Sequence, residues 1–98
     1  MNHEALMNDP DLQRIALACL DYWNAEPLPL DQRSICYKWV ARRYATMFGG
    51  SFHQARLVEL ERLGFLAKDD TSRGGDRRYY RLTDPVRLVE ILKSCNAN

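Results

Sequence analysis

The sequence predicts a mostly α-helical domain with a small β-hairpin, and three observations favour this fold class. Apolar residues recur at helical spacing in four stretches, 9–25, 31–48, 51–63 and 84–95. Proline or glycine stands next to the expected ends of these stretches, where such residues punctuate helices. Residues 65–83 hold two short apolar runs around Gly74-Gly75, the arrangement of two strands joined by a turn.

Length and composition describe one globular domain. With 98 residues, of which 46% are hydrophobic and 28% charged, the chain suits a single modest core in a soluble protein. No apolar run approaches the roughly 20 residues of a membrane helix, and the first residues lack the features of a signal peptide. We therefore expect a cytoplasmic protein that contacts no membrane. Its three cysteines are far apart, which indicates buried thiols rather than a disulfide framework or a zinc site.

Charge is distributed unevenly along a chain whose net charge is only +1. Residues 1–34 hold two Arg and six acids, a balance of −4, whereas residues 42–81 hold nine Lys or Arg and five acids, a balance of +4. A basic middle can give one face a positive potential while the whole protein stays near neutral. Taken alone, this pattern is weak support for a nucleic-acid partner.

We expect a loose lead-in over residues 1–8 and then a core-building helix over 9–25. Asp9-Pro10 marks the start of that helix, because the Asp side chain can cap it and proline suits the first helical position. The acidic character of this helix suits a position on the far side from any nucleic acid.

The second helix is expected over residues 31–48 and carries a basic edge. Gly49-Gly50 ends it, since glycine permits the tight turn that follows. Lys38 and Arg42 lie four positions apart on one side of this helix. They either form a solvated basic face or rest on DNA phosphates, as the helix before a recognition helix commonly does.

A third helix is expected over residues 51–63, and its two sides differ. Ser51, with Gln54 three residues later, forms a capping-box pattern at its start. At about 100° per residue, Leu57 and Leu60 fall on one side and belong to the core. The opposite side presents small and polar side chains outward: Ser51, Gln54, Ala55, Val58 and Arg62.

This outward side has the residues that a helix needs to enter the major groove of DNA. Gln54 can pair with adenine, and Arg62 can reach a phosphate or a guanine. Ala55 or Val58 can touch a thymine methyl group. Glu59 at the border fits less well, because phosphates repel a carboxylate unless it accepts a hydrogen bond from cytosine.

The hairpin over residues 65–83 has a basic tip. In its return strand Tyr80 and Leu82 share one face, which we expect to lie against the helices. Arginines gather at the tip at positions that no core requires, namely Arg73, Arg77 and Arg78. They either solubilise and protect a strand edge or contact the DNA backbone or minor groove.

The last helix, over residues 84–95, is apolar around more than half of its circumference, which is more than one core contact requires. Such a helix needs a second apolar neighbour, and a twofold partner is the simplest source of one. We therefore predict a homodimer, with a contribution from the helix over 9–25. The residues expected at its interface are Leu88, Ile91, Leu92 and Cys95.

Two segments carry a resemblance to a known group of proteins. Leu-Val-Glu-Leu-Glu-Arg-Leu-Gly-Phe-Leu (57–66) and Arg-Arg-Tyr-Tyr-Arg-Leu-Thr (77–83) are similar to the recognition helix and wing of the PadR and MarR groups of bacterial repressors, which are winged helix-turn-helix proteins. The resemblance covers residues 30–84.

The resemblance implies a fold of three helices, a two-stranded wing and a C-terminal helix. It implies that the residues from Ser51 to Arg62 enter the major groove, that Arg73 to Arg78 form the wing tip, and that the terminal helices dimerise. The chain departs from the pattern at His53, where such helices usually bury a valine. No effector domain follows, which favours a small unliganded repressor or an accessory factor.

These features together predict sequence-specific binding of double-stranded DNA by a small dimeric transcriptional regulator, a repressor. The alternative is a winged-helix module for protein contact, because Ala55, Val58 and Glu59 also suit a docking face. An enzyme is not expected, since the only histidines are His3 and His53 and no Ser/His/Asp set or phosphate-binding glycine loop is present. We expect no cofactor and no metal.

Overall fold

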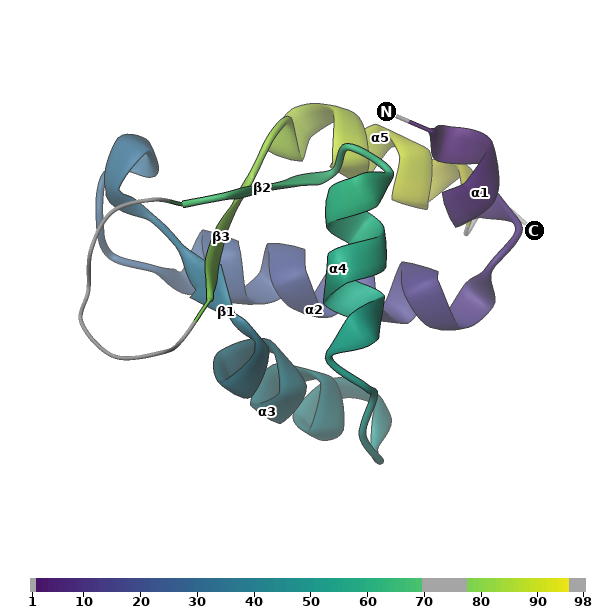
Figure 1. Cartoon of the computed structure of the whole chain (residues 1–98), viewed down its shortest axis with the longest axis horizontal. Helices are drawn as coiled ribbons and strands as arrows, with labels where there is room; N and C mark the ends of the chain where they lie inside the picture. The colour runs from purple at the N-terminus through teal and green to yellow at the C-terminus, as the bar shows by residue number, and fades with distance from the viewer. Residues whose placement is uncertain (1, 70–77, 96–98) are drawn as a thin grey trace.

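The structure, a computed structural model, describes residues 2–69 and 78–95, which form a mostly helical protein with one small sheet (Figure 1). The expected combination of mostly α-helix with a small β element is confirmed. The elements are α1 (His3–Met7), α2 (Pro10–Ala25), the 3-10 turn η1 (Leu30–Gln32), β1 (Ile35–Cys36), α3 (Tyr37–Phe48), α4 (Ala55–Arg62), β2 (Leu66–Lys68), β3 (Tyr79–Leu82) and α5 (Pro85–Cys95).

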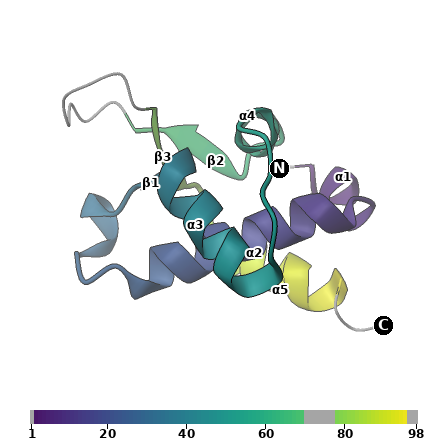
Figure 2. The same cartoon turned by 90° about the horizontal axis from the view of Figure 1, so that it is seen from below.

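Helix α2 is the element on which the other helices pack. It starts as expected, because Asp9 Oδ1 accepts a hydrogen bond from Leu12 N at 3.0 Å and Pro10 fills the first helical position. Figures 1 and 2 show α2 along the length of the molecule, with α3 and α4 on different sides of it. Its buried side chains are Leu12, Ile15, Ala16, Ala18, Cys19, Leu20 and Trp23.

The sheet has three antiparallel strands in the order β1-β3-β2. Tyr80 in β3 pairs with Ile35 on one side and with Lys68 on the other, so β3 is the central strand. Tyr80 and Leu82 point into the core, with 1% and 5% of their surface exposed, as the alternation of the sequence predicts. The hairpin is therefore tied to the helices along its inner face.

The prediction of a helix over residues 31–48 is wrong for the first third of that range. The structure places η1 there and then the two-residue strand β1, and α3 begins only at Tyr37. Ile35 is fully buried, and its pairing with β3 covers a strand edge that would otherwise expose its backbone hydrogen-bonding groups. Tertiary pairing thus overrides the helical spacing of these residues.

The loose lead-in expected over residues 1–8 is wrong for residues 2–8, which the structure describes. They include α1, which Asn2 caps by accepting a hydrogen bond from Ala5 N at 3.3 Å. Leu6 on this helix is fully buried, and α1 contacts both α2 and α5. The backbone N–H of Asn2 also donates to Leu63 O at 2.9 Å, which ties the segment to the end of α4. Leu6 is therefore part of the core, and it fixes α1 against the other helices.

Helix α5 starts as expected, with Asp84 Oδ1 accepting from Arg87 N at 3.0 Å. The dimer interface assigned to this helix needs a correction. Of the four residues expected there, Leu88, Ile91 and Leu92 are buried in the chain's own core and Cys95 is half-buried. The second apolar neighbour that we expected from a twofold partner is instead α1 of the same chain.

The cysteines are free thiols, of which Cys19 and Cys36 are buried. Cys36 lies in β1 rather than on a helix. Burial raises the pKa of the Cys19 thiol well above its usual value, so this group stays protonated and unreactive. No helix among the described residues has the length and apolar character needed to cross a membrane.

Candidate nucleic-acid interface

The two sides of α4 differ as the sequence predicts. Leu57 and Leu60 are buried, with 0% and 1% of their surface exposed. On the other side Gln54, Ala55 and Arg62 are exposed and Val58 is half-buried. The chain therefore leaves most of the side with polar and small residues open to a partner.

The start of α4 differs from the expectation. The helix begins at Ala55, so Ser51 and Gln54 precede it, and Gln54 makes no side-chain capping bond. His53 caps the helix instead, because its Nδ1 accepts a hydrogen bond from Ala55 N at 3.0 Å. His53 is exposed, so it does not replace the buried valine of the resembled helices.

Phe52 explains why the helix starts late. Its side chain is buried, and its ring lies 5.1 Å from the ring of Tyr44 and 5.2 Å from that of Tyr37. The hydroxyl of Tyr37 donates to Phe52 O at 2.6 Å, which uses a backbone carbonyl that a longer helix would need. Burial of Phe52 under α3 thus holds the connection between α3 and α4 in a non-helical path.

Arg56 joins α4 to α2 through ion pairs. Its guanidinium lies 2.6 Å from Asp9 Oδ2, 3.7 Å from Asp11 Oδ2 and 2.5 Å from Glu59 Oε2. The hydrogen bond to Asp9 is the main cause of a raised pKa at Arg56 and of a lowered pKa at Asp9. The sequence does not predict this anchor, although it shows an arginine next to the buried side of a helix and two acids at the start of α2.

The same cluster also contacts α3, and it reduces the repulsion expected between Glu59 and DNA phosphates. Tyr44 OH donates to Asp11 Oδ1 at 2.8 Å, so α2, α3 and α4 meet at one polar junction. Glu59, expected to repel phosphates, has its carboxylate paired with Arg56. A paired carboxylate repels phosphate less than a free one, because the guanidinium offsets its charge.

The lowered pKa of Asp9 predicts a pH dependence of stability. Because the folded value lies below the ordinary 3.8, this group stabilises the fold above that pH, and the contribution is lost as pH falls through the folded value. Asp9→Asn keeps a capping oxygen but loses the charge. We expect its free energy of unfolding, measured with urea from about pH 7 to pH 3, to fall less in acid than that of the natural protein.

A matched control for this prediction is Asp84→Asn. Asp84 also caps a helix in front of a proline, but it makes no ion pair with the rest of the described chain. Its replacement removes a capping carboxylate without breaking an ion pair, so it should change the acid dependence less than Asp9→Asn does. An acid dependence that is the same in all three proteins would contradict the role assigned to the Asp9–Arg56 pair.

The basic edge of α3 consists of Lys38 and Arg42, which are both exposed. Neither forms an ion pair within residues 2–69 and 78–95, and the same holds for Arg62 on α4. Arg43 differs, since its Nη1 lies 2.9 Å from Asp21 Oδ2 and its guanidinium lies over the ring of Tyr22. On α3 and α4, as the structure describes them, Lys38, Arg42 and Arg62 are therefore the cations without an ion pair, and they remain available to phosphates.

The hairpin lies beside α4, and β2 follows the end of that helix (Figure 1). Arg78, at the start of β3, is exposed. Arg73 and Arg77, also expected at the tip, lie outside the described residues. Of the three tip arginines, the structure therefore places Arg78 alone.

Comparison with known proteins identifies no relative of this chain. No family model matches the chain, and no curated protein or solved structure is significantly similar to it. Within the described part of the chain, no group of three or more His, Cys, Asp or Glu side chains is arranged to hold a metal ion. The interpretation of this surface therefore depends on its own residues and geometry.

Proposed function

We propose that the chain is a winged helix-turn-helix protein that binds double-stranded DNA, with α4 in the major groove. The succession of α2, α3 and α4, then the hairpin of β2 and β3, and finally α5 supports this assignment. Strand β1 adds a third strand beside the hairpin. The first helix of such a domain is then α2, and α1 is an addition in front of it.

The observation that carries the proposal is the open side of α4, together with exposed cations on α4 and on the preceding helix α3 that form no ion pair among the described residues. Gln54, Ala55 and Arg62 are exposed on or just before this helix, and Lys38 and Arg42 are exposed on the helix before it. Exposed cations without protein partners suit phosphates, which supply most of the affinity in protein–DNA complexes.

Each residue of the surface has a role in the proposed complex. Gln54 reads adenine and Arg62 contacts guanine or phosphate, while Ala55 and Val58 touch thymine methyl groups. Ser51 lies in the connection before α4, where a hydroxyl can donate to a phosphate. The backbone cations are Lys38, Arg42, Arg73, Arg77 and Arg78.

A transcriptional regulator is the role that such a module serves, and repression is the form that we propose. A homodimer would present two copies of α4 about 34 Å apart to a nearly palindromic site. Since Leu88, Ile91 and Leu92 are buried within the chain, the dimer must use other residues.

The test is the salt dependence of binding to duplex DNA. The five backbone cations and Arg62 release about one counterion each, so the affinity should fall about 1,000-fold between about 50 and 200 mM salt. Fluorescence anisotropy with duplexes recovered from a random library measures the affinity and the symmetry of the site together. Lack of binding at low ionic strength, with the fold intact, would exclude the proposal.

A second candidate function is protein contact, and one observation favours it. Met47 and Phe48 are 39% and 40% exposed at the end of α3. Two exposed apolar side chains suit an interface with another protein better than contact with phosphates. An intact fold without salt-dependent DNA binding would favour this second function.

A further inference from the structure

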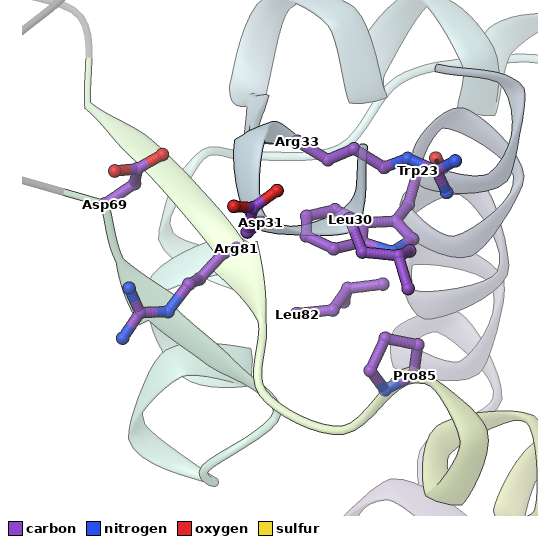
Figure 3. Close-up of a pocket in the computed structure, with 8 residues that line it drawn as sticks. All are labelled: Trp23, Leu30, Asp31, Arg33, Asp69, Arg81, Leu82 and Pro85. Carbon is purple, nitrogen blue, oxygen red and sulfur yellow. Dashed lines mark hydrogen bonds between the residues drawn. The ribbon is translucent and has the colours of Figure 1, made fainter. Parts of the chain in front are cut away.

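His53 and Trp23 each have a ring nitrogen without a hydrogen-bond partner among the described residues, namely His53 Nε2 and Trp23 Nε1. Trp23 lines a pocket of about 500 Å³ between the end of α2, η1, the hairpin and the start of α5, but its Nε1 is buried. Figure 3 shows the Arg81 side chain at this pocket pointing away from Trp23, so it does not complete a polar site with the indole. His53 is exposed, and it is therefore the residue of the two that a ligand can reach.

The hydrogen bond at the start of α4 fixes where the proton of the His53 ring lies. His53 Nδ1 accepts from Ala55 N at 3.0 Å. An accepting ring nitrogen carries no proton, so the neutral imidazole carries its proton on Nε2. The edge with Nδ1 lies against the backbone of the helix, so the exposed part of the ring is the far edge, where Nε2–H is. His53 thus presents a hydrogen-bond donor to the solvent.

The first backbone amides of α4 already have acceptors. Ala55 N donates to His53 Nδ1, and the amides of Arg56 and Leu57 donate to His53 O and Gln54 O at 2.9 and 3.0 Å. A helix start commonly binds an anion through such amides when they are free. Here these three amides are occupied, and His53 Nε2–H takes their place as a donor.

His53 lies where a recognition helix reads bases. His53, Gln54 and Ala55 are consecutive exposed residues at the start of α4. Recognition helices of helix-turn-helix proteins contact base edges with their N-terminal residues. In the proposed complex, an exposed donor at this position therefore faces the base edges.

A single fixed donor distinguishes among the four bases. On the major-groove edge of guanine both N7 and O6 are acceptors, whereas adenine places a donor, its N6 amino group, beside N7. Cytosine presents an amino donor, and thymine presents a single acceptor beside its methyl group. Guanine is therefore the base that fits best to a neutral imidazole with its proton on Nε2.

We propose that His53 is a specificity-determining residue whose Nε2–H donates to N7 of a guanine in the major groove. This inference rests on the proposed binding of duplex DNA by α4. It gives the start of the helix two base-reading residues, His53 for guanine and Gln54 for adenine. Because an imidazole that accepts at Nδ1 is neutral, His53 contributes to the sequence preference and not to the salt dependence of binding.

The experiment compares the natural protein with His53→Asn, each selecting sites from random duplex DNA. Asparagine is a good helix cap, because its Oδ1 can accept from Ala55 N as Nδ1 does, but its side chain ends short of the Nε2 position. We expect the natural protein to enrich a guanine at one position of the site where the variant has no preference. Replacement of this guanine by 7-deazaguanine, which lacks N7, should weaken binding of the natural protein about tenfold. The variant should bind both duplexes equally.

Matched controls separate this contact from helix capping and from charge. Gln54→Ala changes the neighbouring exposed residue, which makes no side-chain capping bond, and should keep the preference for guanine while losing one for adenine at another position. Inosine in place of the guanine keeps N7 and O6 and should bind as guanine does. His53→Asn should have the same urea midpoint as the natural protein and the same slope of log affinity against log salt.

Two results would overturn the inference and leave the proposed function intact. One is selection of the same sites by the natural protein and by His53→Asn. The other is a loss of affinity in the variant that is uniform across sequences, which would assign His53 to the phosphate backbone. Absence of duplex binding by the natural protein would overturn both, so the two failures are distinguishable. His53→Ser, which also caps a helix and lacks the ring, gives the same test if His53→Asn does not fold.

Discussion

Replacing Lys38 and Arg42 together by glutamate is expected to weaken binding to duplex DNA about 100-fold at about 50 mM salt. Both side chains are exposed on α3 and lack an ion partner within the described residues. Each exchange replaces an attraction to phosphate by a repulsion. Neutral replacement by glutamine should reduce the slope of log affinity against log salt by about two.

The fold should survive this change. Neither side chain is buried, and a carboxylate in the first turn of α3 interacts favourably with the helix dipole. Circular dichroism and urea unfolding check that the variant is native. A loss of affinity can then be assigned to the surface rather than to unfolding.

The matched control is Arg87→Glu with Lys93→Glu. It changes the net charge by the same amount on α5, which lies across α2 from α3 (Figure 1). Arg87 pairs only with the exposed Glu90 on its own helix among the described residues, so its loss should cost little stability. Equal loss of affinity in both double variants would mean that net charge alone governs binding. Full affinity in the α3 variant would remove this edge from the interface.

Local patterns in the sequence were sufficient to predict which residues form the buried side of α4 and the inner face of the hairpin. Leu57 and Leu60 follow helical spacing, and Tyr80 and Leu82 follow strand alternation, so neighbours along the chain determine which way each pair points. The Asp-Pro pairs likewise mark two helix starts by chemistry within one turn.

What the sequence did not show depends on contacts between distant residues. Ile35 becomes a strand residue because it pairs with Tyr80, 45 positions later. Phe52 delays the start of α4 because it packs on Tyr37 and Tyr44, and Arg56 binds Asp9 on another helix. No spacing rule within a single element contains this information. The sequence therefore predicted the exposed residues of the candidate site, but not the contacts that hold α4 in place.

Helix α1 tests whether contacts between distant residues hold a segment that local patterns predict to be loose. Leu6→Ala is expected to lower the free energy of unfolding by about 3 kcal/mol. Leu6 is fully buried, and α1 packs on α2 and α5. A five-residue helix has no stability of its own in water, so packing must hold it. A truly loose segment would show almost no effect, because its leucine would be hydrated in both states.

The matched control is Met7→Ala, one position later on the same helix. Met7 is 45% exposed, and both exchanges remove a long side chain in favour of alanine. Helix propensity changes similarly in the two variants, so a difference between them reports packing. Equilibrium urea unfolding should place the Met7 variant within about 1 kcal/mol of the natural protein. Equal effects of the two exchanges would contradict the docked α1, and with it the source of the apolar neighbour that α5 requires.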